Sequence, residues 1–252
     1  MNTGGTRSGK AIGFIMTHNC GHLVEDAYNR IPKGALDAII MVDDDSKDKA
    51  ETEKIAQKLG IPFFSHTHTG YGGNVRYGLT KALEMGGDIM VEIHGDGQFD
   101  PSVIPEALKK MRNGYDFVLG SRFIDLKQPL RDGMPLIRYL ANIGLSFIDR
   151  LILRIPLTEL NTGFRVYSKN LVQTLPLEGI SKDHLYSFEV IAQAAYFKLR
   201  IGEIPIRCDY KKEHTSISLG ESVIYAFQTF YILFLFILAR LGFKTSLFRR
   251  KK

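Results

Sequence analysis

Residues 92–101, with the sequence EIHGDGQFDP, place a short acidic loop directly after the apolar run 88–93. In open α/β sheets, ligands bind beyond the carboxyl ends of the strands, where this loop would lie. The closely spaced oxygens of Asp96 and Gln98 suit a hard divalent cation that carries a diphosphate. The alternative is a polar turn before a helix, with Asp100 as the N-cap and Pro101 as the first helical residue.

A second strand end earlier in the chain is also acidic. The apolar run 38–42, AIIMV, leads directly into Asp43, Asp44, Asp45 and Ser46. Parallel strands end at the same edge of a sheet, so the two acidic loops would face one crevice. This repetition favours a ligand site over a simple turn.

The composition indicates a single core and a basic tail. The chain has 252 residues, is 44% hydrophobic and carries a net charge of +6. Residues 240–252 contain six basic and no acidic side chains, so the other 239 residues sum to zero charge. This distribution argues against a nucleic-acid groove on the body and favours an anionic surface that the C-terminus meets. The two cysteines, Cys20 and Cys208, lack ligand spacing and are expected to be reduced thiols in a cytosolic protein.

The N-terminal stretch GGTRSGK at 4–10 is similar to a phosphate-binding loop. However, Ala11 follows Lys10 where such a loop needs a hydroxyl, and no strand precedes it. We therefore expect residues 1–10 to be a mobile terminus, and the apolar segment 11–16 is too short for a secretory signal.

The rest of the chain alternates strand-like and helix-like segments, which predicts βαβ units and a mainly parallel α/β sheet. The expected strands are 11–17, 38–42, 62–65, 88–93 and 117–120, with further body segments at 163–167 and 201–210. The expected helices are 47–59, 72–85, 101–112, 136–155 and 188–197.

Six motifs occur in an order that resembles family 2 glycosyltransferases of the GT-A fold, and most closely their dolichyl-phosphate mannose and glucose synthase branch. They are VDDDS at 42–46, GYGGNVR at 70–76, HGDGQ at 94–98, GSRF at 120–123, NTGFR at 161–165 and FE at 188–189. The resemblance covers roughly residues 11–217. It implies a single Rossmann-like domain that transfers a sugar, with inversion, from a nucleotide diphosphate sugar to a polyprenyl phosphate with the help of a divalent metal.

The resemblance also implies roles for single residues. The nucleotide set is Thr17, Asn19, Asp44, Asp45, Gly72, Asn74, Arg76, His94 and Gly95, in which Asp44 and Asp45 hold the base and the ribose. The metal set is His94, Asp96 and Gln98, for Mg²⁺ or Mn²⁺. His94 replaces the family's usual first aspartate, and imidazole suits Mn²⁺ better than Mg²⁺. The family's usual Asn-Glu pair after the first strand is also missing, since this chain has THNC at 17–20.

The catalytic set implied in the same way is Asp96, Arg122, Arg138, Glu189 and Lys211. Two phosphorylated substrates repel each other, so guanidinium groups are needed to offset that charge and the charge that develops on the leaving diphosphate. The alternatives are that Arg122 and Arg138 are surface residues and that Arg165 and Glu189 form a structural ion pair. For a sugar hydroxyl acceptor, Asp183 or Glu189 would have to act as the general base.

Residues 222–239 form an uncharged apolar segment. As a helix it would be about 27 Å long, against a hydrocarbon core of about 30 Å. A crossing would place the basic tail outside the cytoplasm, against the positive-inside tendency. We therefore expect this helix to lie in the cytoplasmic leaflet, with 136–155 as a second contact. The alternative is a core or oligomer-interface helix.

These observations predict a GT-A domain at 11–217 followed by a membrane-associated helix and basic tail at 218–252. The expected function is transfer of a hexose, of the GDP-mannose or UDP-glucose type, to a polyprenyl or dolichyl phosphate at the cytoplasmic membrane face. The expected partners are the nucleotide sugar, the lipid phosphate and membrane lipids, with no nucleic acid and a possible homo-oligomer. The alternatives are a family 2 transferase with a saccharide or other non-lipid acceptor, and a catalytically weak sugar-nucleotide-binding membrane scaffold.

Overall fold

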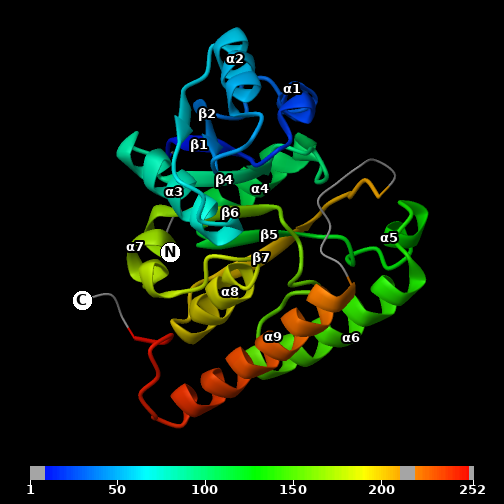
Figure 1. The fold of residues 1–252 in the computed structure, drawn as a ribbon. Coiled ribbons are helices and arrows are strands. Elements are labelled where there is room, and N and C mark those ends of the chain that lie inside the picture. The colour runs from blue at the N-terminus through cyan, green and yellow to red at the C-terminus, as the bar shows by residue number, and fades with distance from the viewer. Residues whose placement is uncertain (1–8, 211–218, 250–252) are drawn as a thin grey trace, which may run out of the picture.

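The computed structural model describes residues 9–210 and 219–249. Figure 1 shows a sheet that crosses the molecule, with helices on both faces and two long helices packed together at one end. The strands are β1 (Ala11–Thr17), β2 (Ala38–Asp43), β3 (Phe63–Ser65), β4 (Ile89–His94), β5 (Phe117–Ser121), β6 (Arg165–Ser168) and β7 (Ile201–Pro205). The longer helices are α1 (Gly21–Asn29), α2 (Lys49–Leu59), α3 (Tyr71–Glu84), α4 (Ile104–Arg112), α6 (Leu136–Leu153), α8 (Tyr186–Tyr196) and α9 (Leu219–Arg240). Shorter turns are η1 (Pro101–Val103), α5 (Gln128–Arg131), α7 (Lys169–Thr174) and η2 (Leu177–Gly179).

The seven strands lie in the order β3-β2-β1-β4-β6-β5-β7. Strand β6 runs antiparallel to both of its neighbours, and the other pairings are parallel, which confirms the predicted α/β class with a mainly parallel sheet. Thr17 pairs with Asp43, and Met16 pairs with His94. This register brings the ends of β1, β2 and β4 to one edge, as the two acidic loops require.

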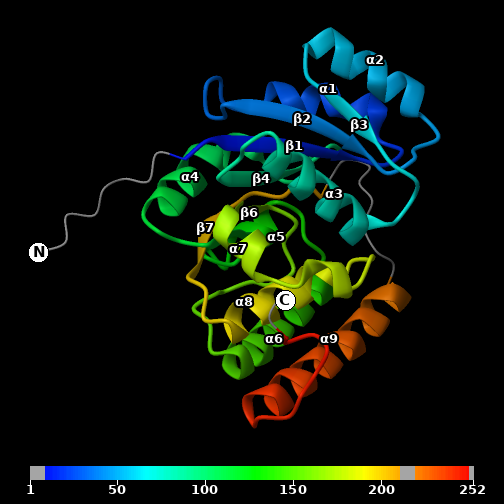
Figure 2. The same cartoon turned by 90° about the vertical axis from the view of Figure 1, so that its left-hand side faces the viewer.

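Two apolar clusters cover the two faces of the sheet, because alternate residues of a strand point to opposite sides. Ile12 and Phe14 of β1 join α3, α7 and α8 on one face, whereas Ala11 and Ile15 join α1, α2 and α4 on the other. Figure 2 shows these helices on either side of the sheet. Residues 11–17 are buried throughout, as expected for a central parallel strand.

Several predicted elements differ from those in the structure. The body segment expected at 201–210 forms strand β7 only over 201–205. The chain then leaves β5 and runs past residues 94–98, which we call the metal loop after their expected ligands, and Cys208 pairs with Phe99. Helix α1 was not predicted; it is short, and no side chain caps its start. The N-cap that we gave as the alternative interpretation of this loop is present, because the Asp100 carboxylate accepts a hydrogen bond from the Ser102 N–H at 3.0 Å. Lys10, which we assigned to the mobile terminus, bonds through its N–H to Asp88 at 3.1 Å.

Helices α6 and α9 lie side by side below the body (Figures 1 and 2). One face of α9 belongs to the main core through Ile232, Leu233 and Phe236. After α9 the chain returns to the body: Gln193 donates a 2.8 Å hydrogen bond to the Leu247 carbonyl. The Phe248 ring lies 4.9 Å from that of Tyr196.

Candidate active site

Asp43 and Asp44, at the end of β2, organise the neighbouring loops. The Asp43 carboxylate accepts hydrogen bonds from the Thr17 hydroxyl at 3.0 Å and from the Ser46 N–H at 3.0 Å. Asp44 accepts from the N–H groups of Thr69 at 2.7 Å and Gly70 at 2.9 Å. Both carboxylates are buried, so these bonds compensate for their lost hydration. Next to them, Asp45 is exposed and has a φ of 55°.

Glu92, in the middle of β4, is completely buried in a polar network. Its carboxylate accepts hydrogen bonds from the Tyr71 hydroxyl at 2.6 Å and the Tyr167 hydroxyl at 2.5 Å, and the Arg165 guanidinium lies at 4.0 Å. Burial opposes ionisation of Glu92, but the hydrogen bond from His94 and the charge of Arg165 outweigh it, so its pKa is lowered. The network therefore contains an ionised carboxylate.

His94 connects this network to the metal loop. Its Nε2 lies 3.2 Å from the Glu92 carboxylate, and its ring contacts Phe99 edge-on at 5.3 Å between centroids. Burial lowers the basicity of the imidazole, but Glu92 more than compensates, so the pKa of His94 is raised. The hydrogen bond to Glu92, two residues earlier on β4, therefore fixes the orientation of the His94 ring.

Glycines allow the metal loop to lie close to β1. A side chain at Gly95 would come within 2.7 Å of the Met16 carbonyl, and Gly97 has a φ of 67°. Asp96 accepts a hydrogen bond from the Gln98 N–H at 3.0 Å. Arg30, at the end of α1, donates to the Gly97 carbonyl at 2.7 Å. The unpredicted helix α1 therefore supports the loop.

Arg122, just after β5, is held by a second buried carboxylate, Glu159. The Glu159 carboxylate accepts from the Arg122 N–H at 2.7 Å and from Nε at 2.8 Å. The Arg122 guanidinium also donates to the Tyr210 hydroxyl at 2.6 Å. This fork is fixed in one orientation before any ligand binds.

A cavity of about 500 Å³ brings these groups together. Its polar side is lined by Tyr71, His94, Asp96, Gln98, Arg122, Arg165, His184 and Ser187. Its other side is lined by α6 and α9, through Ile137, Arg138, Ala141, Asn142, Leu145, Val223 and Ala226. One space therefore joins a polar, charged region to helix faces that are mostly apolar but also carry Arg138 and Asn142.

The structure groups the predicted site residues unequally. His94, Asp96, Gln98, Arg122 and Arg138 line the cavity. Thr17, Asn74 and Gly95 lie at the strand edge beside it: the Asn74 amide donates to the Thr17 carbonyl at 3.3 Å. Asn19 accepts from the Lys47 N–H at 2.8 Å, beside Asp44 and Asp45.

Three other predicted residues have structural partners. Gly72 packs against Tyr186, where a side chain would come within 2.5 Å. Arg76 donates to the Leu177 carbonyl at 3.1 Å. Glu189 accepts from the Ser181 N–H at 2.7 Å. Lys211 lies outside the described residues.

The suggested Arg165–Glu189 ion pair is wrong. Arg165 instead donates to the Tyr71 hydroxyl at 2.8 Å and the Ser187 hydroxyl at 2.7 Å. Sequence reasoning also missed Glu92 and Glu159 as site-forming groups. Glu92 could have been recognised from the sequence, because a carboxylate within an otherwise apolar buried strand needs a hydrogen-bonding or charged partner.

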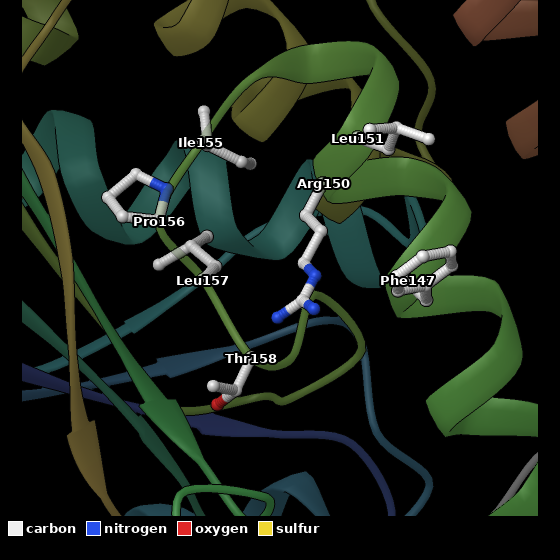
Figure 3. A pocket seen from close by; sticks show the side chains of 7 residues that line it. All are labelled: Phe147, Arg150, Leu151, Ile155, Pro156, Leu157 and Thr158. Carbon is white, nitrogen blue, oxygen red and sulfur yellow. The ribbon is translucent and has the colours of Figure 1, made fainter.

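A second cavity, of about 430 Å³, lies at the C-terminal end of α6 (Figure 3). It is lined by Phe147, Arg150, Leu151, Ile155, Pro156, Leu157 and Thr158, none of which lines the first cavity. Figure 3 shows Arg150 extending from α6 toward Thr158. Its guanidinium lies 5.3 Å from the centre of the Phe147 ring.

Comparison with solved structures identifies the class of fold. Glucosyl-3-phosphoglycerate synthase from Mycobacterium tuberculosis, in complex with phosphoglyceric acid, aligns with a TM-score of 0.67 at 18% identity, over 95% of this chain and 82% of that one. The same enzyme has been crystallised with Mn²⁺ and UDP, and with Mg²⁺ and UDP, with TM-scores of 0.65 and 0.63. The fold is therefore that of GT-A-like glycosyltransferases.

The sequence comparisons then show the family. Residues 14–175 match the glycosyl transferase family 2 model, so the chain belongs to glycosyl transferase family 2 and is a glycosyltransferase. A UDP-N-acetylglucosamine–dolichyl-phosphate N-acetylglucosaminyltransferase from Methanococcus voltae is 31% identical over 238 residues, covering 86% of this chain and 92% of the relative. An undecaprenyl-phosphate mannosyltransferase from Micrococcus luteus is 28% identical, covering 67% of this chain and 70% of the relative. These findings confirm the predicted family and branch.

Proposed function

We propose that this protein transfers a sugar, with inversion, from a nucleotide diphosphate sugar to a polyprenyl phosphate. The observation that carries the proposal is the single cavity in which the metal loop and the apolar faces of α6 and α9 meet. A saccharide acceptor would not require the apolar wall formed by Ile137, Leu145 and Val223. The relatives from M. voltae and M. luteus, which are named for lipid-phosphate acceptors, support the same acceptor class.

The donor would occupy the carboxyl edge of β1, β2 and β4. Both oxygens of Asp44 already accept loop N–H groups, so we propose that Asp44 shapes the nucleotide site and that exposed Asp45 contacts the nucleotide. At the metal loop, Asp96 and Gln98 offer oxygens and His94 an imidazole nitrogen. This donor set fits Mn²⁺ better than Mg²⁺. A bound ion would offset charge on the donor diphosphate.

The acceptor phosphate would meet the two cavity arginines. Arg122 presents a guanidinium fixed by Glu159, and Arg138 lies in the first turn of α6 beside Asn142. An oxygen of the acceptor phosphate attacks the anomeric carbon, and the bond between that carbon and the donor diphosphate breaks. The nucleoside diphosphate leaves with the bonding electrons. Since the attacking phosphate is anionic near neutral pH, this reaction needs no strong general base.

The proposed membrane contact rests on the distribution of exposed apolar side chains. Among the described residues, every exposed large hydrophobic side chain lies within 124–151 or 223–243. Phe227 is 72% exposed and Leu151 is 67% exposed. Such a patch is typical of a membrane-contact surface. Helix α9 is long and apolar enough to cross a membrane by composition, but its core contacts and the return of 247–248 to α8 favour an in-plane position on the cytoplasmic leaflet.

A transfer assay tests this function. Radiolabelled UDP- and GDP-sugars would be incubated with a short polyprenyl phosphate and Mn²⁺ or Mg²⁺, and we expect lipid-soluble label from at least one donor. Label transferred only to a saccharide acceptor would support the non-lipid alternative. Nucleotide-sugar binding without turnover under all conditions would support the scaffold alternative.

A further inference from the structure

A group of potential metal ligands lies at the ends of the three neighbouring strands β1, β2 and β3. His18 follows β1, Asp44 follows β2 and His68 follows β3. Their ligand atoms all lie within 4.8 Å of one another. None of the three residues lines the 500 Å³ cavity. The group is therefore separate from the metal loop.

The two imidazoles converge on the same residue. His18 Nδ1 lies 3.0 Å from the Asp44 carbonyl oxygen. His68 Nδ1 lies 3.3 Å from that carbonyl oxygen and 2.9 Å from Oδ2 of the Asp44 carboxylate. Two ring nitrogens thus face two oxygens of one residue, which is a compact set of nitrogen and oxygen ligands.

The Asp44 carboxylate is preorganised for such a role. Its side chain is 3% exposed and is fixed by the N–H groups of Thr69 and Gly70. Oδ1 accepts from both the N–H and the hydroxyl of Thr69, whereas Oδ2 accepts a single backbone N–H, from Gly70, and keeps a lone pair for a metal ion. The imidazoles, in contrast, are accessible, with the His68 side chain 59% exposed, so an ion can enter from solvent. A third imidazole, His66, lies 3.7 Å from the same carboxylate.

We propose that His18, Asp44 and His68 bind a transition-metal cation of the zinc class. Imidazole and carboxylate ligands suit Zn²⁺, Co²⁺ and Ni²⁺, whereas Mg²⁺ prefers oxygen ligands only. The ion joins the loops that follow three adjacent strands, so it holds this edge of the sheet together. The ion would lie at the edge of the sheet that the donor is proposed to occupy, next to Asp45, but the metal-binding experiments below do not depend on the transfer reaction.

Metal binding at His18 requires a change in the hydrogen bonds of its ring. His18 Nε2 lies 2.9 Å from the Asn19 side-chain amide nitrogen, which places the ring proton on Nδ1. Metal binding at Nδ1 moves that proton to Nε2, and the Asn19 amide turns its oxygen toward it. Asn19 then gives up its exposed hydrogen bond from the Lys47 N–H. The Asn19 amide oxygen then accepts a hydrogen bond from Nε2–H of the metal-bound His18, as partners of metal-bound histidines commonly do.

Co²⁺ is a suitable probe, because its visible absorption reports nitrogen and oxygen ligands. We expect the full-length protein to bind Co²⁺ with a visible band that Zn²⁺ abolishes by competition. His18→Ala and His68→Ala should each weaken Co²⁺ binding by at least about tenfold. The matched control is His22→Ala, an exposed histidine on α1 outside the group, which should bind as the wild type does. Zn²⁺ should also raise the melting temperature of the wild type more than that of His68→Ala.

His94→Ala distinguishes this site from the metal loop. If the Co²⁺ band survives in His94→Ala and is lost in His68→Ala, the proposal holds. If the band is lost in His94→Ala and kept in His68→Ala, the ion binds at the metal loop and the proposal is wrong. It is equally wrong if His18→Ala and His68→Ala match His22→Ala. Should either alanine variant unfold, His18→Gln and His68→Gln provide the same comparison with a side chain of similar size.

Discussion

At the scale of single residues, Asp96 is the carboxylate of the metal loop that lines the cavity. We expect Asp96→Ala to lower turnover by at least ~10²-fold, the scale of removing a preorganised electrostatic group. Steady-state transfer rates measure this effect, and exposed Asp125→Ala is the control. Wild-type activity that survives exhaustive chelation would show that the loop does not act through a metal.

The position of His94 gives a second prediction about the metal. His94→Asp restores an oxygen ligand, so we expect the ratio of Mg²⁺-supported to Mn²⁺-supported turnover to rise. Activity titrations with each ion measure that ratio. An unchanged ratio would mean that His94 contacts Glu92 and lines the cavity but does not bind the ion.

The two cavity arginines should respond differently to lysine. Arg122 is buried against Glu159, and lysine cannot reproduce its forked contacts. Arg122→Lys should therefore lower both activity and melting temperature, whereas Arg138→Lys, in the partly exposed first turn of α6, should lower activity alone. Transfer kinetics and thermal melts separate the two outcomes. Full kcat and KM in both variants would remove the arginines from the mechanism.

The sequence indicates the residues of this site that follow strand ends, and it misses those that depend on distant pairing. Asp96 and Gln98 could be predicted because an acidic loop after a buried strand is a local pattern. The contact of Glu92 with Arg165 could not, since it requires β6 to insert antiparallel beside β4. Arg122 was predicted as a phosphate ligand, but its partner Glu159 lies in an irregular segment without a recognisable pattern.

At the scale of elements, α6 buries an acidic side chain. Asp149 is 2% exposed, its Oδ1 has no hydrogen-bond partner among the described residues, and burial raises its pKa from 3.8 to about 7. The folded state therefore holds a proton that the unfolded state releases between about pH 4 and 7. Stability should fall as pH rises through that range, by an upper limit on the order of 4 kcal/mol.

Asp149→Asn should remove this decline, because the amide does not ionise. We expect the variant to be more stable than the wild type at pH 8 and similar to it at pH 4, as measured by denaturant unfolding across that range. Exposed Asp125→Asn should follow the wild-type curve. Parallel curves for Asp149→Asn and the wild type would show that Asp149 stays hydrated.

Helix α9 packs on the core with one face and exposes apolar side chains on the other. Deleting residues 222–252 would not test membrane contact alone, because α9 contributes Ile232 and Phe236 to the main core and the deletion would also disturb the body. The sharper change is Phe227→Asn with Phe234→Asn, both on the exposed face. Each phenylalanine contributes about 1.5–3 kcal/mol when it is buried.

We therefore expect the double variant to bind anionic vesicles much more weakly with an unchanged melting temperature. The contrasting control is Ile232→Ala on the buried face, which should lower the melting temperature and leave vesicle binding intact. Vesicle sedimentation and thermal melts measure the two effects. Equal vesicle binding by the double variant and the wild type would mean that α9 does not contact lipid.

Among the elements, strands were easier to predict than short helices. Short apolar runs such as 38–42, rich in β-branched residues and flanked by aspartates, are typical of strands in a parallel sheet. Helix α1 escaped detection because it is only 9 residues long and no side chain caps its start, although its buried residues do lie on one face. The body segment at 201–210 is a strand only as far as Pro205, because its pairing with β5 stops at Ser121.

At the scale of the whole molecule, the return of the chain after α9 bears on topology. Because 247–248 pack on α8, residue 246 should stay on the same side of the membrane as the catalytic domain. Ser246→Cys in intact cells should resist impermeant maleimides added outside and react after lysis. The native Cys20 and Cys208 are buried and give a low background. Labelling from outside intact cells would show that α9 crosses the bilayer.

The position of β6 also has a consequence for how the chain acquires its structure during synthesis. Strands β1 to β4 can pair as soon as they leave the ribosome, but β5 has no partner until β6 emerges, since the two halves of the sheet meet only through β6. We expect a nascent chain that ends before residue 165 to protect the amides of β1 but not those of β5, which hydrogen exchange on stalled chains would measure. For that interval the apolar β5 is an unpaired edge, and the chain then depends most on chaperones.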